Sequence, residues 1–94
     1  MVYVDNFYTT GAGNFGRMKM SHMIADTRKE LLEMAYKIGL QKRWIQSYGT
    51  TREHFDVSIN TRKKAISYGA IEIGFRELAE KTSTRIYEGI KPNI

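Results

Sequence analysis

Histidine and aspartate residues are the side chains in this sequence best suited to bind a metal ion or to transfer protons. The chain has five of them, all in or at the ends of predicted strands: Asp5, His22, Asp26, His54 and Asp56. Imidazole nitrogens and carboxylate oxygens occur in metal sites and in acid–base pairs. The chain has no H-E-x-x-H, H-x-H or D-x-D motif that would fix the geometry of such a site. From spacing alone we therefore predict no catalytic residue, metal ligand or cofactor.

Basic residues open two predicted helices. The tripeptide Thr-Arg-Lys occurs at the start of each, at residues 27–29 and 61–63. The first turn of a helix already attracts anions through its unpaired backbone N–H groups and the positive end of its dipole. If the preceding strands lie side by side, both helix starts emerge at one edge of the sheet, where α/β proteins usually bind ligands. We therefore predict that phosphate groups bind to Arg28, Lys29, Arg62 and Lys63.

The segment Gly11–Gly16, GAGNFG, has the G-x-G-x-x-G spacing of dinucleotide-binding loops. That motif needs a helix after its last glycine, so that free N–H groups meet the pyrophosphate. The residues that follow, RMKMSHMIA, instead alternate like a strand. We therefore interpret the segment as a connection between two strands, from which Phe15 and Arg17 reach a ligand.

Three further side chains complete the predicted ligand site. Tyr8, like Phe15, lies in a loop near basic residues, where an aromatic ring can stack on a base. His22 and His54 are predicted to orient the ligand by hydrogen bonds. The chain lacks a ribonucleoprotein-type aromatic signature, a zinc-finger spacing and a P-loop, which argues against sequence-specific binding of nucleic acid.

The hydrophobic pattern predicts a single α/β domain with a mixed sheet of about four to five strands and two to three helices. Strands are predicted within 1–7, 17–25, 40–48, 54–59 and 70–73. Thr27 and Glu30 have the spacing of a capping box, for a helix that ends at Gly39. A second helix is predicted from Asn60 or Thr61 to residue 69, and a short third one over 75–81. We assign residues 1–82 to the domain and 83–94 to a tail that packs on the body or on a neighbouring subunit.

Composition narrows the class of protein. The 94 residues are 41% hydrophobic and include no cysteine, which excludes disulfides, thiolate nucleophiles and cysteine-ligated metals. No apolar run approaches the roughly 20 residues of a membrane span, and no secretory signal is visible, so we expect a cytoplasmic protein with no membrane partner. So short a chain has a small core, which favours a homo-oligomer. The net charge of +5 favours an anionic partner.

An ordered set of short motifs runs through the chain: YVD at 3–5, GRM at 16–18, SHMIAD at 21–26, W-x-Q at 44–46, HFD at 54–56 and GAIEI at 69–73. In these motifs the sequence resembles the bacterial and phage proteins of domain-of-unknown-function family 4031. The resemblance spans about residues 2–78 and implies a small α/β domain without an assigned activity. It also implies recurrent polar positions at Arg17, His22, Asp26, His54 and Asp56. The chain departs from the family pattern at Ser21, where a cysteine is expected, at Phe55, where a tyrosine is common, and in a longer first loop.

These features predict a non-enzymatic protein that binds a phosphate-containing, nucleotide-like small molecule. By analogy with other small phage proteins, it is a candidate for sequestering a nucleotide signal of host defence in the bacterial host cell. One alternative is a metal-dependent nuclease or phosphoesterase that uses Asp5, Asp26, His54 and Asp56. Another is a nucleic-acid-binding or protein-inhibitor module whose basic face meets its partner directly.

Overall fold

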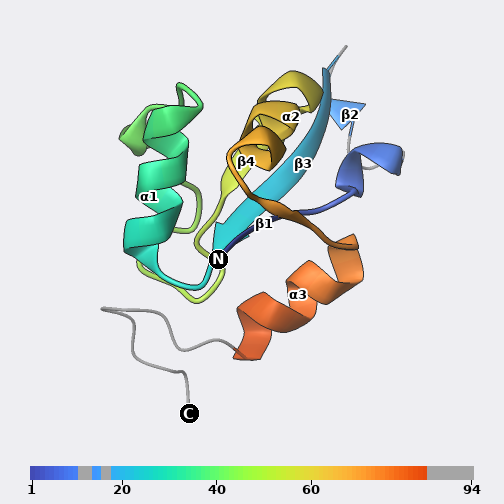
Figure 1. Ribbon diagram of the computed structural model, residues 1–94. Coiled ribbons are helices and arrows are strands. Elements are labelled where there is room, and N and C mark those ends of the chain that lie inside the picture. Colours follow the sequence, from blue (N-terminus) through green and yellow to red (C-terminus); the bar gives the residue numbers. More distant parts are fainter. Residues whose placement is uncertain (11–13, 16–17, 85–94) are drawn as a thin grey trace.

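The computed structural model describes residues 1–10, 14–15 and 18–84, which form one small unit built around a mixed sheet (Figure 1). The strands in these residues are β1 Val2–Val4, β2 Asn14–Phe15, β3 Met18–Ala25, β4 Phe55–Ser58 and β5 Ile71–Glu72. The helices are α1 Arg28–Lys37, α2 Ile59–Ser67 and α3 Phe75–Thr84, with the short 3₁₀ helices η1 Phe7–Thr9 and η3 Lys42–Trp44. The predicted α/β class, with its mixed sheet, is confirmed.

Strand β3 lies at the centre of the sheet. It pairs antiparallel with β1 on one side, where Val4 faces Met23, and antiparallel with β4 on the other, where Met23 faces Phe55. Strand β5 adds to β1 in parallel, which gives the order β4-β3-β1-β5, and β2 pairs with the start of β3. Residues from β1, β3 and β4 are therefore aligned directly across the sheet.

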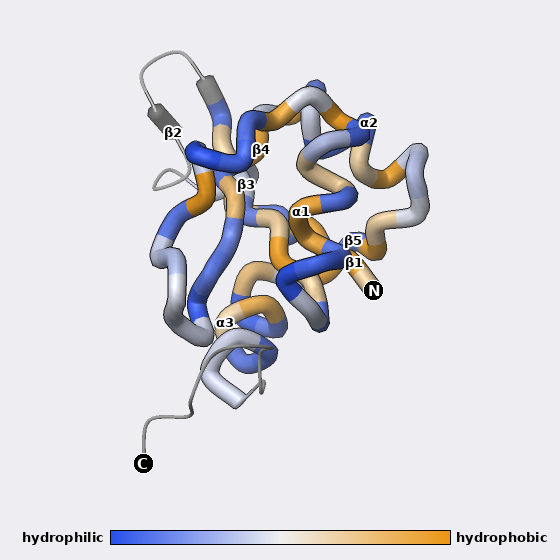
Figure 2. Tube along the Cα trace, turned by 90° about the vertical axis from the view of Figure 1, so that its left-hand side faces the viewer, coloured by the Kyte–Doolittle hydropathy of each residue, from blue (hydrophilic) through white to orange (hydrophobic). Residues whose placement is uncertain are grey.

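The two faces of the sheet have different surroundings. Alternate residues of β1, β3 and β4, among them Val4, Met23 and Phe55, join the hydrophobic core together with Leu31 of α1 and Ala65 of α2. Helix α3 lies apart from α1 and α2 in both views (Figures 1 and 2). Since successive side chains of a strand point to opposite faces, the residues between the core positions point to the face that α3 covers.

Helix α1 begins and ends where the sequence predicts. The backbone N–H of Glu30 donates to Oγ1 of Thr27, which caps the helix. At the other end, Gly39 adopts a φ of +85°, a conformation that a residue with a side chain rarely adopts. The predicted capping residue and the predicted stop are both confirmed.

Helix α2 begins earlier than predicted. Its N-cap is Ser58, the last residue of β4, whose Oγ accepts a hydrogen bond from the N–H of Thr61, so neither Asn60 nor Thr61 is the cap. The chain enters the helix directly from the strand because this serine can satisfy a helical N–H group without an intervening loop. Arg62 and Lys63 consequently lie in the second turn of α2 and not at its start.

The strand predicted within residues 40–48 is wrong. Lys42–Trp44 form the 3₁₀ helix η3, and only Gln46 pairs with another strand-like residue, His54, in an isolated bridge. Ser47 and Gly49 both have positive φ values, of +54° and +80°, and turn the chain immediately after that bridge. The aromatic residues that favoured a strand, Trp44 and Tyr48, are instead exposed.

The glycine-rich segment connects two strands, as predicted, although it contains a strand of its own. Phe15 of β2 pairs with Met18 of β3, so a strand and not a helix follows Gly16. The other residues of the segment at 11–13, and those at 16–17, lie outside the described part of the chain, as does most of the predicted tail, residues 85–94. Within the described ranges, no helix combines the length and the apolar character needed to cross a bilayer.

Candidate functional site

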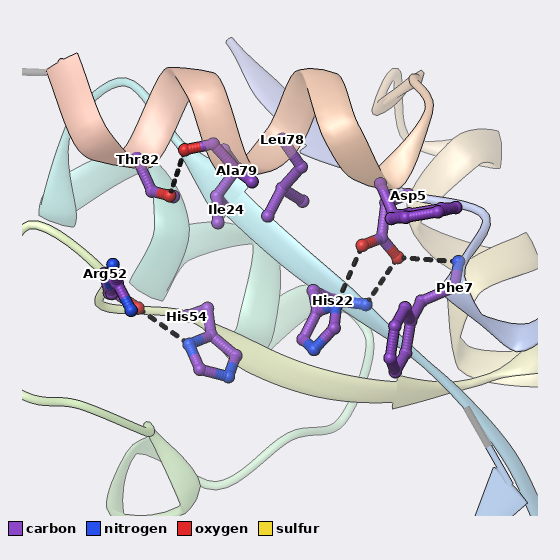
Figure 3. Close-up of a pocket in the computed structure, with 10 residues that line it drawn as sticks. Asp5, Phe7, His22, Ile24, Arg52, His54, Leu78, Ala79 and Thr82 are labelled. Atoms are coloured by element: carbon purple, nitrogen blue, oxygen red, sulfur yellow. Dashed lines mark hydrogen bonds and ion pairs between the residues drawn. The ribbon is translucent and has the colours of Figure 1, made fainter. Parts of the chain in front are cut away.

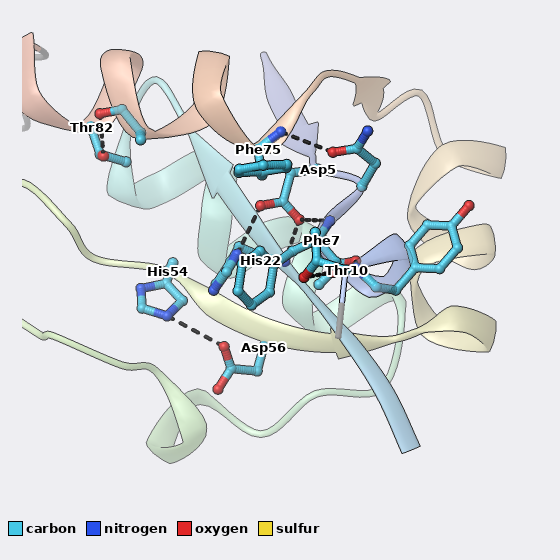
Figure 4. A network of polar contacts seen from close by, with 12 residues as sticks. Asp5, Phe7, Thr10, His22, His54, Asp56, Phe75 and Thr82 are labelled. Carbon is cyan, nitrogen blue, oxygen red and sulfur yellow. Dashed lines mark hydrogen bonds and ion pairs between the residues drawn. The ribbon is translucent and has the colours of Figure 1, made fainter. Parts of the chain in front are cut away.

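Three strands place acidic and imidazole side chains side by side on the face opposite the core. His22 of β3 is paired in register with Asp56 of β4. On its other side, the backbone N–H of Asp5, just after β1, donates to the carbonyl oxygen of His22 at 3.0 Å. Directly opposed residues of neighbouring strands carry their side chains on the same face. The three side chains therefore gather in one row across the sheet (Figure 4).

A cavity of about 310 Å³ lies between this face and α3 (Figure 3). Its polar lining residues are Asp5, His22, Arg52, His54 and Thr82. Its apolar lining residues are Phe7, Ile24, Phe75, Leu78 and Ala79. A cavity of this size lies at the small end of the range that binds small molecules.

Asp5 holds the ring of His22 from behind. Its Oδ2 lies 2.8 Å from Nδ1 of His22, and its Oδ1 accepts from the N–H groups of His22 and Phe7 at 2.9 and 3.2 Å. Burial alone would raise the pKa of this fully buried carboxyl, but the hydrogen bonds from His22 and Phe7 outweigh it and leave the pKa below its usual value. The ionised Asp5 can only accept a hydrogen bond from Nδ1, so in the neutral ring of His22 the lone pair lies on Nε2.

The backbone orients His54 in the same manner. Its Nδ1 lies 2.7 Å from the carbonyl oxygen of Arg52, which can only accept, so Nδ1 carries the proton and in the neutral ring Nε2 carries the lone pair. Nε2 lies 3.4 Å from Oδ1 of Asp56. A hydrogen bond from the protonated form of the His54 ring lowers the pKa of Asp56, which is therefore ionised near neutral pH.

His22, His54 and Asp56 form a candidate metal-binding cluster. One ligand atom from each lies within 4.8 Å of the others, and the two imidazole rings are 5.3 Å apart, centroid to centroid. Ligand atoms around a bound zinc ion lie about 3.3 Å apart, so a closure of about 1.5 Å at the widest would complete the site. Metal-binding histidines almost always donate their other ring N–H to a carboxylate or a carbonyl, as these two do. Two imidazoles and one carboxylate suit divalent zinc, iron or manganese.

Asp26, included in the predicted enzyme alternative, lies away from this cluster. It follows the far end of β3, where it accepts a hydrogen bond from the hydroxyl of Tyr3 at 3.3 Å and pairs with the amino group of Met1 at 3.2 Å. The structure thus brings together Asp5, His54 and Asp56 from that alternative, and adds His22.

The two cationic helix starts do not share an edge of the sheet. Because β3 and β4 run antiparallel, the helices that follow them, α1 and α2, begin at opposite ends. Arg28 makes two hydrogen bonds to the buried carboxylate of Glu53, at 2.9 and 2.8 Å, and its guanidinium lies over the ring of Tyr48. Lys29 and Lys63 are exposed. The expected common phosphate site at the two helix starts is therefore not formed.

Arg62 is buried, and its guanidinium group is hydrogen-bonded within the fold. Only 7% of the residue is exposed; its Nε donates to the carbonyl oxygen of Asp5 at 2.8 Å, and its Nη2 lies 3.0 Å from Oε1 of Glu72. The guanidinium also covers the ring of Tyr8 at 5.0 Å. Arg62 therefore ties α2 to the ends of β1 and β5.

Replacing Arg62 with alanine is expected to lower the free energy of unfolding by about 2 kcal/mol, because the carbonyl of Asp5 loses a charged donor. Urea denaturation measures this loss. The exposed neighbour Lys63 provides the control, and Lys63→Ala should change stability by less than about 0.5 kcal/mol. Similar values for the two variants would show that the contacts of Arg62 do not stabilise the fold.

Of the predicted ligand-binding residues, His22 and His54 line the cavity. Tyr8 is half-buried, and its N–H donates to Oγ of Ser21 at 2.9 Å. Arg17 lies outside the described residues, and of Phe15 only the strand position is described. Sequence reasoning did not assign Arg52 or Phe75 to the site. The alternation of polar with core residues in β3 and β4 could have indicated that the candidate metal-binding cluster shares one face of the sheet. No local pattern in the sequence indicates that Arg52 lines the cavity.

Comparison with known families assigns the chain to a family but not to an activity. A family model described as "Protein of unknown function (DUF4031)" matches residues 2–85, from β1 through α3. The chain therefore belongs to this family, as its motifs suggested. No curated protein and no solved structure matches the chain.

Proposed function

We propose that this protein is a metal-dependent phosphoesterase whose divalent ion binds to His22, His54 and Asp56. The observation that carries the proposal is the orientation of the two histidines. Asp5 and the carbonyl of Arg52 each hold an Nδ1 atom, which leaves the two Nε2 atoms to bind an ion, and one ligand atom from each histidine and from Asp56 lies within 4.8 Å of the others.

The proposed chemistry follows from the number of ligands. A divalent ion would be held by His22, His54 and Asp56, three protein ligands of the kind and number found in catalytic metal sites. Such an ion would lower the pKa of a water molecule and so supply the nucleophile for hydrolysis of a phosphate ester. Arg52 lines the same cavity as His22 and His54 and provides a positive charge for the phosphate. The net charge of +5 attracts such an anionic substrate.

Metal titration and an ester assay test the proposal. Metal-free protein should bind one Co²⁺ or Zn²⁺ ion per chain in calorimetry, and the Co²⁺ form should show visible absorption of a low-coordinate site with nitrogen and oxygen ligands. p-Nitrophenyl phosphate should then be hydrolysed with Mn²⁺, Co²⁺ or Zn²⁺ and not with a chelator present. Absence of stoichiometric metal binding would overturn the proposal. Binding of a phosphate compound without turnover would instead favour the non-enzymatic binder predicted from the basic residues.

A further inference from the structure

The cavity beneath α3 has an aromatic corner next to the candidate metal ligands. The ring of Phe7 lies 4.8 Å from the ring of His22 and 5.9 Å from that of Phe75, measured between centroids, and meets Phe75 edge-on. Leu78 of α3 continues this apolar wall and is itself largely buried. One wall of the cavity is therefore apolar and partly aromatic, and its first ring, Phe7, lies directly beside the imidazole of His22 (Figure 4).

The other wall is polar and belongs to the proposed phosphate site. It contains His54 and Arg52, while Thr82 of α3 lines the cavity further along (Figure 3). A phosphate group alone would need only this polar wall. Covering the apolar wall of a water-accessible cavity with an apolar group lowers the free energy, because it removes apolar surface from water. Aromatic rings prefer offset or edge-on contacts with another ring. The cavity thus fits a ligand with two unlike ends.

We infer that the substrate is a phosphate monoester whose organic part carries a planar aromatic ring, as in a nucleoside monophosphate or an aryl phosphate. The ring packs against Phe7 and Phe75 while the phosphate meets Arg52 and the metal. This inference rests on the proposed function for the phosphate end of the substrate. The aromatic corner supports the other end independently of any metal.

Affinities of matched ligands test the inference. In competition with p-nitrophenyl phosphate for the metal-loaded protein, AMP or phenyl phosphate should have an inhibition constant at least about tenfold lower than that of ribose 5-phosphate, which lacks the ring. Tighter binding of AMP than of phenyl phosphate identifies a nucleobase as the ring, and the reverse order identifies an aryl group. Equal affinities for all three ligands would overturn the inference.

A variant assigns the preference to the aromatic corner. Phe75→Leu keeps an apolar side chain but removes the ring, and should abolish the preference over ribose 5-phosphate without changing the affinity for ribose 5-phosphate itself. Tyr68, an exposed aromatic residue at the end of α2, provides the control, and Tyr68→Leu should retain the preference. A preference that survives in Phe75→Leu would contradict the assignment.

A measurement without metal separates this inference from the proposed function. In the metal-free protein, adenosine should shift the NMR signals of Phe75 and Leu78, whereas ribose should not. Shifts without any metal binding would refute the metal site and leave the aromatic site intact. Metal binding and ester hydrolysis without these shifts and without the tenfold preference would refute the aromatic site alone.

Discussion

His22→Ala is expected to weaken divalent metal binding by more than 100-fold and to abolish phosphoester hydrolysis. Loss of a group that only orients a metal ligand typically costs 10–100-fold in affinity, so loss of the ligand itself should cost more. The fold should survive the change, since 30% of the His22 side chain is exposed and the buried Asp5 carboxylate keeps its hydrogen bonds from the backbone N–H groups of His22 and Phe7 when it loses the ring. Calorimetric titration of the metal-free variant, with a urea melt to confirm folding, measures both effects.

Asp5→Asn provides a graded version of the same experiment. The asparagine amide would present an N–H to Nδ1 of His22, so the ring proton would move to Nε2 and block the metal-binding atom. We expect a 10–100-fold loss of metal affinity, intermediate between the wild type and His22→Ala. Asp26→Asn is the matched control, because Asp26 lies outside the cluster and should leave metal affinity unchanged. Equal losses in the two asparagine variants would contradict the orienting role of Asp5.

Glu53→Ala is expected to lower the free energy of unfolding by about 3–5 kcal/mol, the largest stability effect that we predict. The Glu53 carboxylate is fully buried and accepts two hydrogen bonds from Arg28 and one, at 2.8 Å, from the N–H of Gly49. Removing it leaves the Arg28 guanidinium without its bidentate partner. Urea denaturation followed by circular dichroism measures the loss.

A second glutamate–arginine pair provides the control for Glu53. Glu72 also pairs with an arginine, Arg62, but 60% of its side chain is exposed, so Glu72→Ala should cost less than about 1 kcal/mol. Glu53 also lies between Arg52 and His54 in the chain, so Glu53→Ala should reduce metal affinity where Glu72→Ala does not. Equal stability losses in Glu53→Ala and Glu72→Ala would show that burial does not make the Glu53–Arg28 pair more important for stability than the exposed pair.

Strands β1, β3, β4 and β5, the first helix, and the placement of His54 and Asp56 in the enzyme alternative could be predicted because their signals are local. Alternation marks β1 and β4, and the same alternation separates His54 and Asp56 from the core residue between them. Thr27 and Gly39 mark the two ends of α1. Each of these features depends on residues within one turn or one strand of each other, which is the range over which sequence patterns carry structural information.

The remainder depends on contacts between distant residues. The two helix starts lie apart because β4 runs antiparallel to β3, and no residue in either strand predicts this direction. Arg28 and Arg62 read as surface cations, yet each binds an acidic or carbonyl partner far away in the chain. The apolar wall comes from Phe75, whose N–H donates to the side chain of Asn6, 69 positions earlier. Tertiary pairing of this kind leaves no periodic trace in the sequence.

Strand β3 serves the core and the cavity with alternate residues, Met23 inward and His22 toward α3. A strand with this double role cannot change its length internally without exchanging the two sets of side chains. If the residues after it keep their register, deletion of Ile24 would turn the side chain of Met23 toward the cavity and that of His22 into the core. Length variation among family members should therefore fall outside β3, in the connections before and after it. In a library of single-residue insertions, variants with an insertion inside β3 should fail to fold.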